Sequence, residues 1–162
     1  MAAQAALAMT LIAACVGADS AWMVGDSAVS QEDGIVLCSA TPKIAACGGW
    51  LVGAAGDAGA CTALLARAWP SEPRALLRAL RGVGGEWEAL LARPGALYVA
   101  DSDGDLEAIS RRYWAIGSGA QVGLGVMAAS RARTPRSLLM QASRITESLR
   151  GDVRGPFAIL SA

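Results

Sequence analysis

The hydrophobic pattern of this 162-residue chain changes its period several times, and the order of these changes limits the fold it can adopt. Short apolar runs bounded by glycine, typical of strands, are followed by segments with apolar residues at helical spacing, and this succession then repeats. Strands and helices grouped in this way predict an α+β fold, with two helical layers over packed antiparallel sheets. The predicted strands are 10–16, 21–26, 34–40, two or three within 43–56, 96–100, 106–109, one in 113–119, and 156–160. The predicted helices are 58–69, 71–92, 119–130 and 136–149.

Length and composition indicate a single domain. The chain is long enough to bury one sizeable core and too short for two ordinary domains. Hydrophobic residues make up 54% of it, but alanine and glycine supply much of this share, which favours close packing of layers over a bulky core. The formal net charge is zero, so we expect neither nucleic acid nor a membrane surface as a partner, and we expect a cytoplasmic location.

The chain contains no histidine, which removes the usual general base and the commonest metal ligand. Acid–base chemistry near neutral pH must then come from a group with a shifted pKa or from the chain's own α-amino group. The four cysteines occur without a CxxC pair and are expected to be small buried thiols of a reducing compartment. We therefore expect no metal and no cofactor.

The first eighteen residues form an uncharged, apolar run of signal-peptide length, and residues 12–15 resemble a lipoprotein cleavage box. A secretory signal needs a positively charged segment before its apolar run, and no Lys or Arg is present there. The run is also too short and too rich in alanine for a membrane span. Export as a lipoprotein whose mature chain starts at Cys15 is therefore an alternative and not the expectation.

Four polar residues stand out against this apolar background. Thr10 begins the first predicted strand, and Asp26 ends the next one sixteen positions later. Lys43 is the only lysine, since the other thirteen basic residues are arginine, and it lies between proline and an apolar run. Ser118 sits between two glycines in AIGSGA.

These residues and their surroundings resemble the proteasome β-subunit and HslV threonine peptidases, which are N-terminal nucleophile hydrolases. The resemblance runs from Met9 through nearly the whole chain. It rests on MTLIAA, VGDSAV, the single lysine, LVGAAGDAGA, LYVADSDG and AIGSGA, taken in this order and at this spacing. It implies a four-layer αββα sandwich formed by residues 10–162 as a single proteasome/HslV-like domain.

The resemblance also implies a role for each of these polar residues. Thr10 would be the nucleophile, with its free α-amino group as general base, and an amine of pKa about 7.7–8.0 suits that task in a chain without histidine. Lys43 would supply a compact ammonium beside the nucleophile, and Asp26 would balance its buried charge. Ser118 would support the amine, and the backbone N–H of Gly56 would stabilise the oxyanion.

The position of Thr10 departs from the family pattern, because nine residues precede it and a free amine is then absent. Residues 1–9 are interpreted either as a propeptide that is cut off or as a misassigned start. In the second case translation begins at Met9 and removal of that methionine exposes Thr10.

The segment near the C-terminus departs as well. The family pattern has an aspartate and, three residues later, a Ser or Thr before a Gly-Gly-like turn. Alignment on the turn at 155–156 puts Arg150 and Val153 at these two places. Asp152 and Ser148 lie close by, and a local shift would let either serve. Asp152 is the candidate substitute for the catalytic aspartate.

The predicted function is that of a threonine-type peptidase subunit in a self-compartmentalised, homo-oligomeric ring. The resemblance implies a hexamer or heptamer, stacked in pairs, that hydrolyses unfolded polypeptide in an enclosed chamber. Its likeness to HslV implies an ATP-dependent AAA+ unfoldase as a partner. Two alternatives are a catalytically silent ring-forming homologue and an N-terminal nucleophile amidohydrolase that acts on a small amide.

Overall fold

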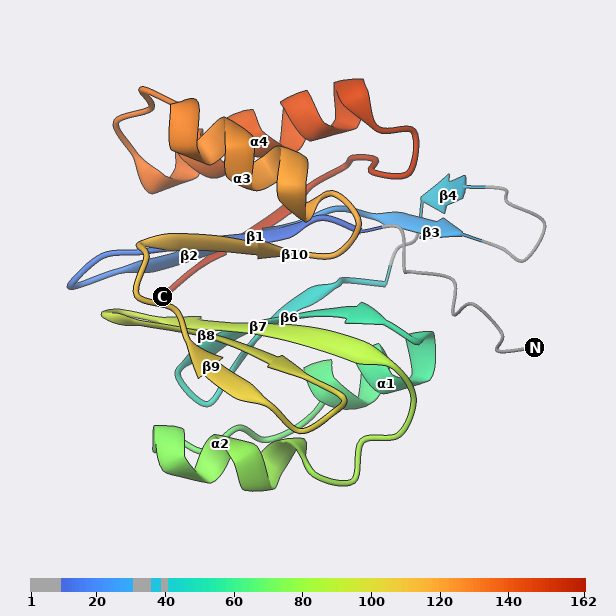
Figure 1. Cartoon of the computed structure of the whole chain (residues 1–162), viewed down its shortest axis with the longest axis vertical. Coiled ribbons are helices and arrows are strands. Elements are labelled where there is room, and N and C mark those ends of the chain that lie inside the picture. The colour runs from blue at the N-terminus through green and yellow to red at the C-terminus, as the bar shows by residue number, and fades with distance from the viewer. Residues whose placement is uncertain (1–9, 31–35, 39–40) are drawn as a thin grey trace.

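The computed structural model describes residues 10–30, 36–38 and 41–162, so the interpretation of residues 1–9 lies outside the described residues. Two antiparallel sheets are stacked on each other and enclosed by two helical layers (Figure 1). The first sheet, in the order β10-β1-β2-β11, contains β1 (Ile12–Val16), β2 (Ala21–Gly25), β10 (Tyr113–Ile116) and β11 (Ala158–Ser161). The second sheet, in the order β5-β6-β7-β8-β9, contains β5 (Ile44–Cys47), β6 (Trp50–Gly56), β7 (Trp87–Arg93), β8 (Ala96–Asp101) and β9 (Leu106–Ala108). The helices are α1 (Ala58–Leu65), α2 (Pro73–Leu80), α3 (Ala120–Ala129) and α4 (Pro135–Leu149), and β3 (Ala28–Ser30) pairs with β4 (Val36–Cys38).

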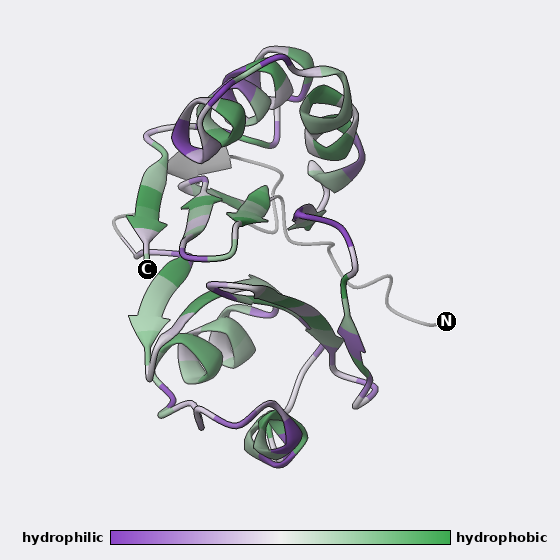
Figure 2. Cartoon of the chain, turned by 90° about the vertical axis from the view of Figure 1, so that its left-hand side faces the viewer, coloured by the Kyte–Doolittle hydropathy of each residue, from purple (hydrophilic) through white to green (hydrophobic). Residues whose placement is uncertain are grey.

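Three apolar cores separate the four layers, and strand β1 contributes to two of them. Alternate side chains of a strand point to opposite faces of the sheet. Ile12 and Ala14 accordingly pack into the core between the two sheets, whereas Leu11 and Ala13 pack against α3 and α4. A third core joins the second sheet to α1 and α2. Figure 2 shows the resulting pattern, with hydrophobic strands inside and hydrophilic residues on the outer helical surfaces and loops.

The predicted helix over 71–92 is wrong in its second half. Helix α2 ends at Leu80, and Gly82 and Gly85 adopt φ values of +82° and +86°, which L-residues with a side chain rarely adopt. The chain then enters β7, which lies between β6 and β8 in the middle of the second sheet. A central strand is buried on both faces, so its apolar run is continuous and resembles a helix in the sequence. Leu90 and Leu91 are both fully buried, one in each adjoining core.

Strand β3 was not predicted, and the other elements follow their expected order with shifted ends. Helix α1 stops at Leu65 and not at residue 69, because the chain turns and the buried Trp69 indole donates a hydrogen bond of 3.2 Å to the Leu64 carbonyl. Asp57 caps the start of α1 by accepting from the Ala60 N–H at 3.0 Å. Among the described helices, none combines the length and the apolar character needed to span a membrane.

Candidate active site

The topology of the first sheet brings distant segments to one edge. Strand β1 lies between β10 and β2 and is antiparallel to both, with Ile12 opposite Ile116 on one side and Gly25 on the other. The start of β1 therefore lies beside the ends of β10 and β2. These three chain ends carry Ser118, Thr10 and Asp26, and the turn before β5 in the second sheet adds Lys43.

All three polar groups of Thr10 have partners in this arrangement. Its nitrogen donates to Ser118 Oγ at 3.2 Å, and its carbonyl accepts from the N–H of Gly119 at 3.0 Å. Its hydroxyl oxygen, Oγ1, accepts a hydrogen bond from Lys43 Nζ. The side chain of Thr10 is thereby fixed toward the only lysine of the chain.

Asp26 is the electrostatic and structural anchor of the site. One carboxylate oxygen accepts from Lys43 Nζ at 2.9 Å and from the N–H of Leu11 at 3.1 Å. The other oxygen accepts from the N–H groups of Ala28 at 3.2 Å and of Arg154 at 3.4 Å. Aspartate and asparagine side chains have the same shape, but only the carboxylate of aspartate accepts hydrogen bonds at both terminal atoms. The amide of asparagine has one oxygen that accepts and one NH₂ group that donates. Asp26 thus ties β1, its own loop, the C-terminal segment and Lys43 together.

Burial determines the electrostatics of the Lys43–Asp26 pair, whose side chains are 13% and 0% exposed. Burial lowers the pKa of the Lys43 ammonium, and the Asp26 carboxylate opposes this lowering. Burial also raises the pKa of Asp26, against the charge of Lys43 and the hydrogen bonds that the carboxylate accepts. An ammonium in this position donates to Thr10 Oγ1 and would stabilise a negative charge on that oxygen.

Of the two candidates near the C-terminus, Asp152 reaches the site and Ser148 does not. Ser118 Oγ donates to Asp152 Oδ2 at 2.8 Å, whereas the Ser148 hydroxyl donates to the Ile145 carbonyl within its own helix. Arg150 holds Asp152 from the other side with two hydrogen bonds of 2.8 and 2.7 Å. The bonds from Arg150 and Ser118 keep the pKa of Asp152 below its usual range, although partial burial opposes them.

Gly56, the predicted oxyanion donor, lies at the end of β6. Two residues earlier, the N–H of Ala54 donates to the Lys43 carbonyl at 3.1 Å, so Gly56 is at the end of the second sheet where Lys43 enters. Its φ of +126° and the close approach of the Glu86 backbone leave no room for a side chain. The role of its N–H in stabilising an oxyanion stays a prediction.

Gly117 and Glu88 belong to this site although their sequence context did not single them out. A Cβ on Gly117 would lie 2.5 Å from the Thr10 carbonyl oxygen, and its φ of +85° also requires glycine. The Gly117 N–H donates to Glu88 Oε2 at 3.2 Å. For Gly117, the glycine-rich segment AIGSGA could have indicated a place in the site. No sequence feature indicated Glu88, because its segment was predicted to be a helix and not strand β7.

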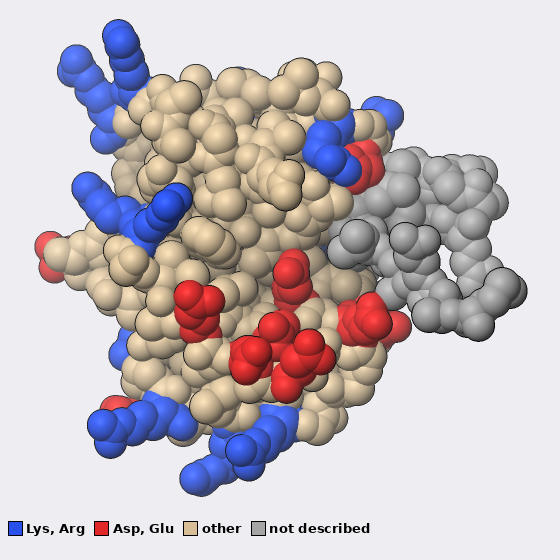
Figure 3. Space-filling model, in the orientation of Figure 1, with Lys and Arg blue, Asp and Glu red and all other residues tan. Residues whose placement is uncertain are grey.

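A cleft of about 470 Å³ adjoins Gly117 and runs between β8, β9, β10 and α3. Carboxylates line it, and Figure 3 shows acidic side chains gathered on this face over the second sheet. The acidic residues in its lining are Glu88, Asp101, Asp105 and Glu107.

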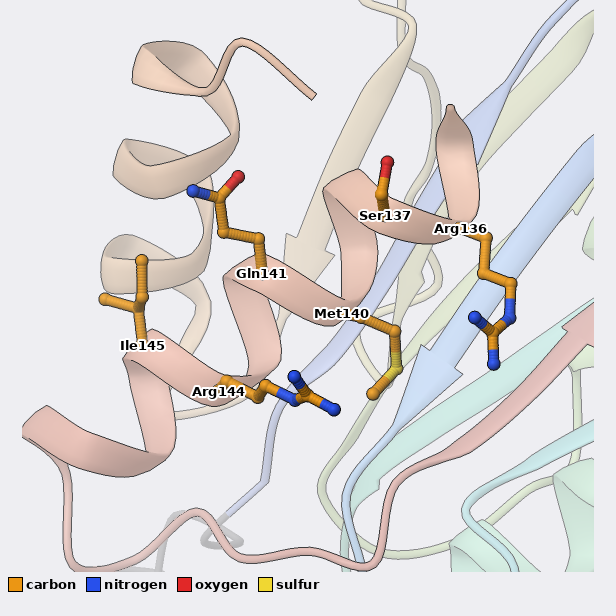
Figure 4. A pocket seen from close by; sticks show the side chains of 6 residues that line it. All are labelled: Arg136, Ser137, Met140, Gln141, Arg144 and Ile145. Atoms are coloured by element: carbon orange, nitrogen blue, oxygen red, sulfur yellow. The ribbon is translucent and has the colours of Figure 1, made fainter. Parts of the chain in front are cut away.

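A second hollow lies on the outer surface of α4, between Arg136 and Ile145, and contains none of the predicted site residues (Figure 4). In the part of the chain that the structure describes, no three Cys, Asp or Glu side chains are grouped so that they could hold a metal ion.

No known protein-family model and no curated protein sequence matches this chain. Solved structures match it over nearly its whole length. BPH from Thiobacillus denitrificans in complex with epoxomicin has a TM-score of 0.78 at 16% identity, covering 94% of this chain and 98% of that one. Another BPH structure from that organism has a TM-score of 0.73 at 16% identity, covering 94% and 97% of the two chains. Eukaryotic HslV from Trypanosoma brucei has a TM-score of 0.71 at 17% identity, with 94% of this chain and 98% of that chain covered. The chain therefore has the four-layer αββα fold of the proteasome β-subunit and HslV type, as its sequence motifs predict.

Proposed function

We propose that this protein is a threonine-type peptidase subunit with Thr10 as its nucleophile. One observation carries the proposal: Lys43 Nζ donates to Thr10 Oγ1 while Ser118 Oγ contacts Thr10 N. The hydroxyl and the nitrogen of one threonine, two residues before β1 begins, are thus each held by a polar side chain. A structural threonine in a strand needs neither contact.

The mechanism uses the α-amino group in place of the missing histidine. The neutral amine of Thr10 accepts the Oγ1 proton as Oγ1 attacks the scissile carbonyl carbon. Lys43 stabilises the developing alkoxide, and the N–H of Gly56 stabilises the oxyanion of the tetrahedral intermediate. The protonated α-amino group of Thr10 then gives its proton to the nitrogen of the departing peptide fragment. The C–N bond breaks, and the acyl part of the substrate stays on Thr10 Oγ1 as an ester. Water, deprotonated by the same amine, hydrolyses this ester and regenerates the hydroxyl.

This mechanism requires a free amino group on Thr10. In the chain as printed, the nitrogen of Thr10 is the peptide nitrogen of the Met9–Thr10 bond, which cannot act as a base. The active form is therefore the one in which Thr10 is the first residue. It arises by removal of residues 1–9 or, where translation begins at Met9, by removal of that methionine.

The proposed substrate is unfolded polypeptide, and the proposed assembly is a homo-oligomeric ring of six or seven subunits, stacked in pairs. Both are taken from the resemblance to the proteasome β-subunit and HslV, as is an AAA+ unfoldase partner. The basis for this part of the proposal is the fold that the chain shares with BPH and HslV over 94% of its length.

The test combines the N-terminal mass with peptide hydrolysis. We expect purified protein whose first residue is Thr10 to cleave fluorogenic peptide amides, and Thr10→Ala to abolish cleavage. Thr62→Ala, which removes an exposed threonine hydroxyl on α1, is the matched control and should leave cleavage unchanged. Hydrolysis that survives Thr10→Ala would refute the mechanism. A chain that starts at Thr10, assembles and cleaves nothing would identify the protein as the silent ring-forming homologue.

A further inference from the structure

We propose that Arg150 is a positioning residue that fixes the Asp152 carboxylate, and through it Ser118, beside the nitrogen of Thr10. The inference rests on the proposed function, because it assigns Arg150 a role toward the α-amino base. In the sequence this arginine stands where an aspartate is expected. In the structure it is the partner that holds the substituting aspartate in place.

A continuous chain of polar contacts links the guanidinium to the base. Arg150 Nε donates to Asp152 Oδ1 at 2.8 Å, and its terminal nitrogen donates to Oδ2 at 2.7 Å. Oδ2 also accepts from Ser118 Oγ at 2.8 Å, and Ser118 Oγ accepts from Thr10 N at 3.2 Å. The Ser118 proton is thereby committed to the carboxylate, so that Ser118 turns a lone pair toward the nitrogen.

Backbone contacts on both sides of Asp152 hold Arg150 and Asp152 in these positions. The N–H of Arg150 donates to the Thr146 carbonyl at 2.8 Å and so anchors it to the last turn of α4. Val153 is fully buried on the other side of Asp152. The next residue, Arg154, binds Asp26 through its N–H and Ser27 through its carbonyl. Asp152 thus lies between two fixed points, with its side chain 16% exposed.

The bidentate contact between Arg150 and Asp152 also determines the net charge near the Thr10 α-amino group. Two hydrogen bonds, of 2.8 and 3.2 Å, separate the Asp152 carboxylate from the nitrogen, so an unbalanced negative charge there would favour the protonated form of the amine. The Arg150 guanidinium balances that charge. Its planar fork matches both carboxylate oxygens, which a lysine cannot do.

The experiment measures the pKa of the Thr10 α-amino group directly in the form that begins at Thr10. This form keeps the fold, because every described residue of the three apolar cores lies within residues 11–160. Acetic anhydride labels the neutral amine, and the pH dependence of labelling, followed by mass spectrometry of the N-terminal peptide, gives the pKa without any need for peptidase activity.

Replacement of one partner at a time predicts shifts of opposite sign. Arg150→Gln leaves the Asp152 charge unbalanced and should raise the pKa of the amine by about 0.5–1 unit. Asp152→Asn leaves the arginine unbalanced and should lower it, so the inference is testable even where Arg150→Gln fails to fold. Arg150→Lys keeps the charge but loses the bidentate contact, so it should raise the pKa less than Arg150→Gln does. Arg144→Gln, an exposed arginine on α4, should leave the pKa unchanged.

The midpoint of the acidic limb of kcat should move with the pKa of the amine in each variant. A purely structural role for Arg150 predicts lower activity with an unmoved midpoint. The inference is overturned if the amine of Arg150→Gln titrates like that of the wild type, or if Asp152→Asn does not lower its pKa. Failure of the proposed function gives a different result, namely a wild-type chain starting at Thr10 that cleaves no peptide while its amine pKa still responds to Arg150.

Discussion

Asp26→Asn is expected to destabilise the fold far more than its small change in shape suggests. The carboxylate accepts four hydrogen bonds, two on each oxygen. The amide of asparagine has one oxygen and one NH₂ group. In either orientation the NH₂ group faces two of the four donors, and these two lose their acceptor. The favoured orientation turns the NH₂ group toward the N–H groups of Ala28 and Arg154, because those bonds of 3.2 and 3.4 Å are the longest.

The free-energy cost follows from what is left without a partner. A buried N–H that loses its acceptor costs about 1–3 kcal/mol, and two are affected here. Arg154 is exposed, so water compensates part of its loss, which places the total at about 2–4 kcal/mol. Lys43 also loses its charged partner, but its pKa is already lowered by burial and it can shed its proton. We therefore do not add the full cost of an unpaired buried charge.

Urea unfolding followed by tryptophan fluorescence measures this cost, at a protein concentration where all variants have the same association state. Asp101→Asn is the matched control. Asp101 accepts from the N–H groups of Asp103 and Asp105 with a single oxygen, which asparagine retains, so we expect a change below about 0.5 kcal/mol. If Asp26→Asn lies within 1 kcal/mol of Asp101→Asn, the four-acceptor account of Asp26 is wrong.

Two further predictions concern the surroundings of the site, one on Gly117 and one on the thiol of Cys61. Gly117→Ala should destabilise by more than the roughly 1–2 kcal/mol of its positive φ, since the new methyl group would lie 2.5 Å from the Thr10 carbonyl oxygen. Gly104→Ala, at φ +92° with open space around it, isolates the backbone cost in the same urea assay, and equal losses would contradict the clash. The thiol of Cys61, whose pKa burial and the charge of Asp57 raise to about 11, should react with iodoacetamide at pH 8 about 100-fold more slowly than an ordinary thiol. Asp57→Asn should accelerate the reaction of Cys61, and unfolding in urea should restore the ordinary rate; a fast reaction in the native wild type would disprove the raised pKa.

The sequence allowed most of the fold to be predicted because most strands are short apolar runs that end at a recognisable turn. Strand β1 and the hairpin of β8 and β9 are where the pattern places them. Strand β7 could not be predicted in this way. Its run WEALLAR is apolar on both faces, since it lies in the centre of a sheet that is covered on both sides. Only the pairing with β6 and β8, which is not local information, distinguishes such a strand from a helix.

The grouping of Thr10, Asp26 and Lys43 was predicted because these residues and their motifs resemble the proteasome β-subunit and HslV family, and because Lys43 is the only lysine of the chain. The C-terminal segment carried no comparable signal. Residues 150–155 form no helix or strand, so no periodicity indicates which side chain points to Ser118. The choice between Asp152 and Ser148, and the contribution of Arg150, required the three-dimensional path of this loop.

Two ion pairs flank Thr10, and the mechanism proposed for a site without histidine depends on their balance. Lys43 with Asp26 faces the hydroxyl, and Arg150 with Asp152 faces the nitrogen through Ser118. Each charge has a partner of opposite sign, so we expect the net electrostatic effect of the two pairs on an α-amine at this position to be small. The ordinary pKa of an α-amine, about 7.7–8.0, is suited to a general base at neutral pH. In the proposed mechanism, Arg150 thus has a role of its own, because it balances the charge of Asp152, which contacts Thr10 N through Ser118.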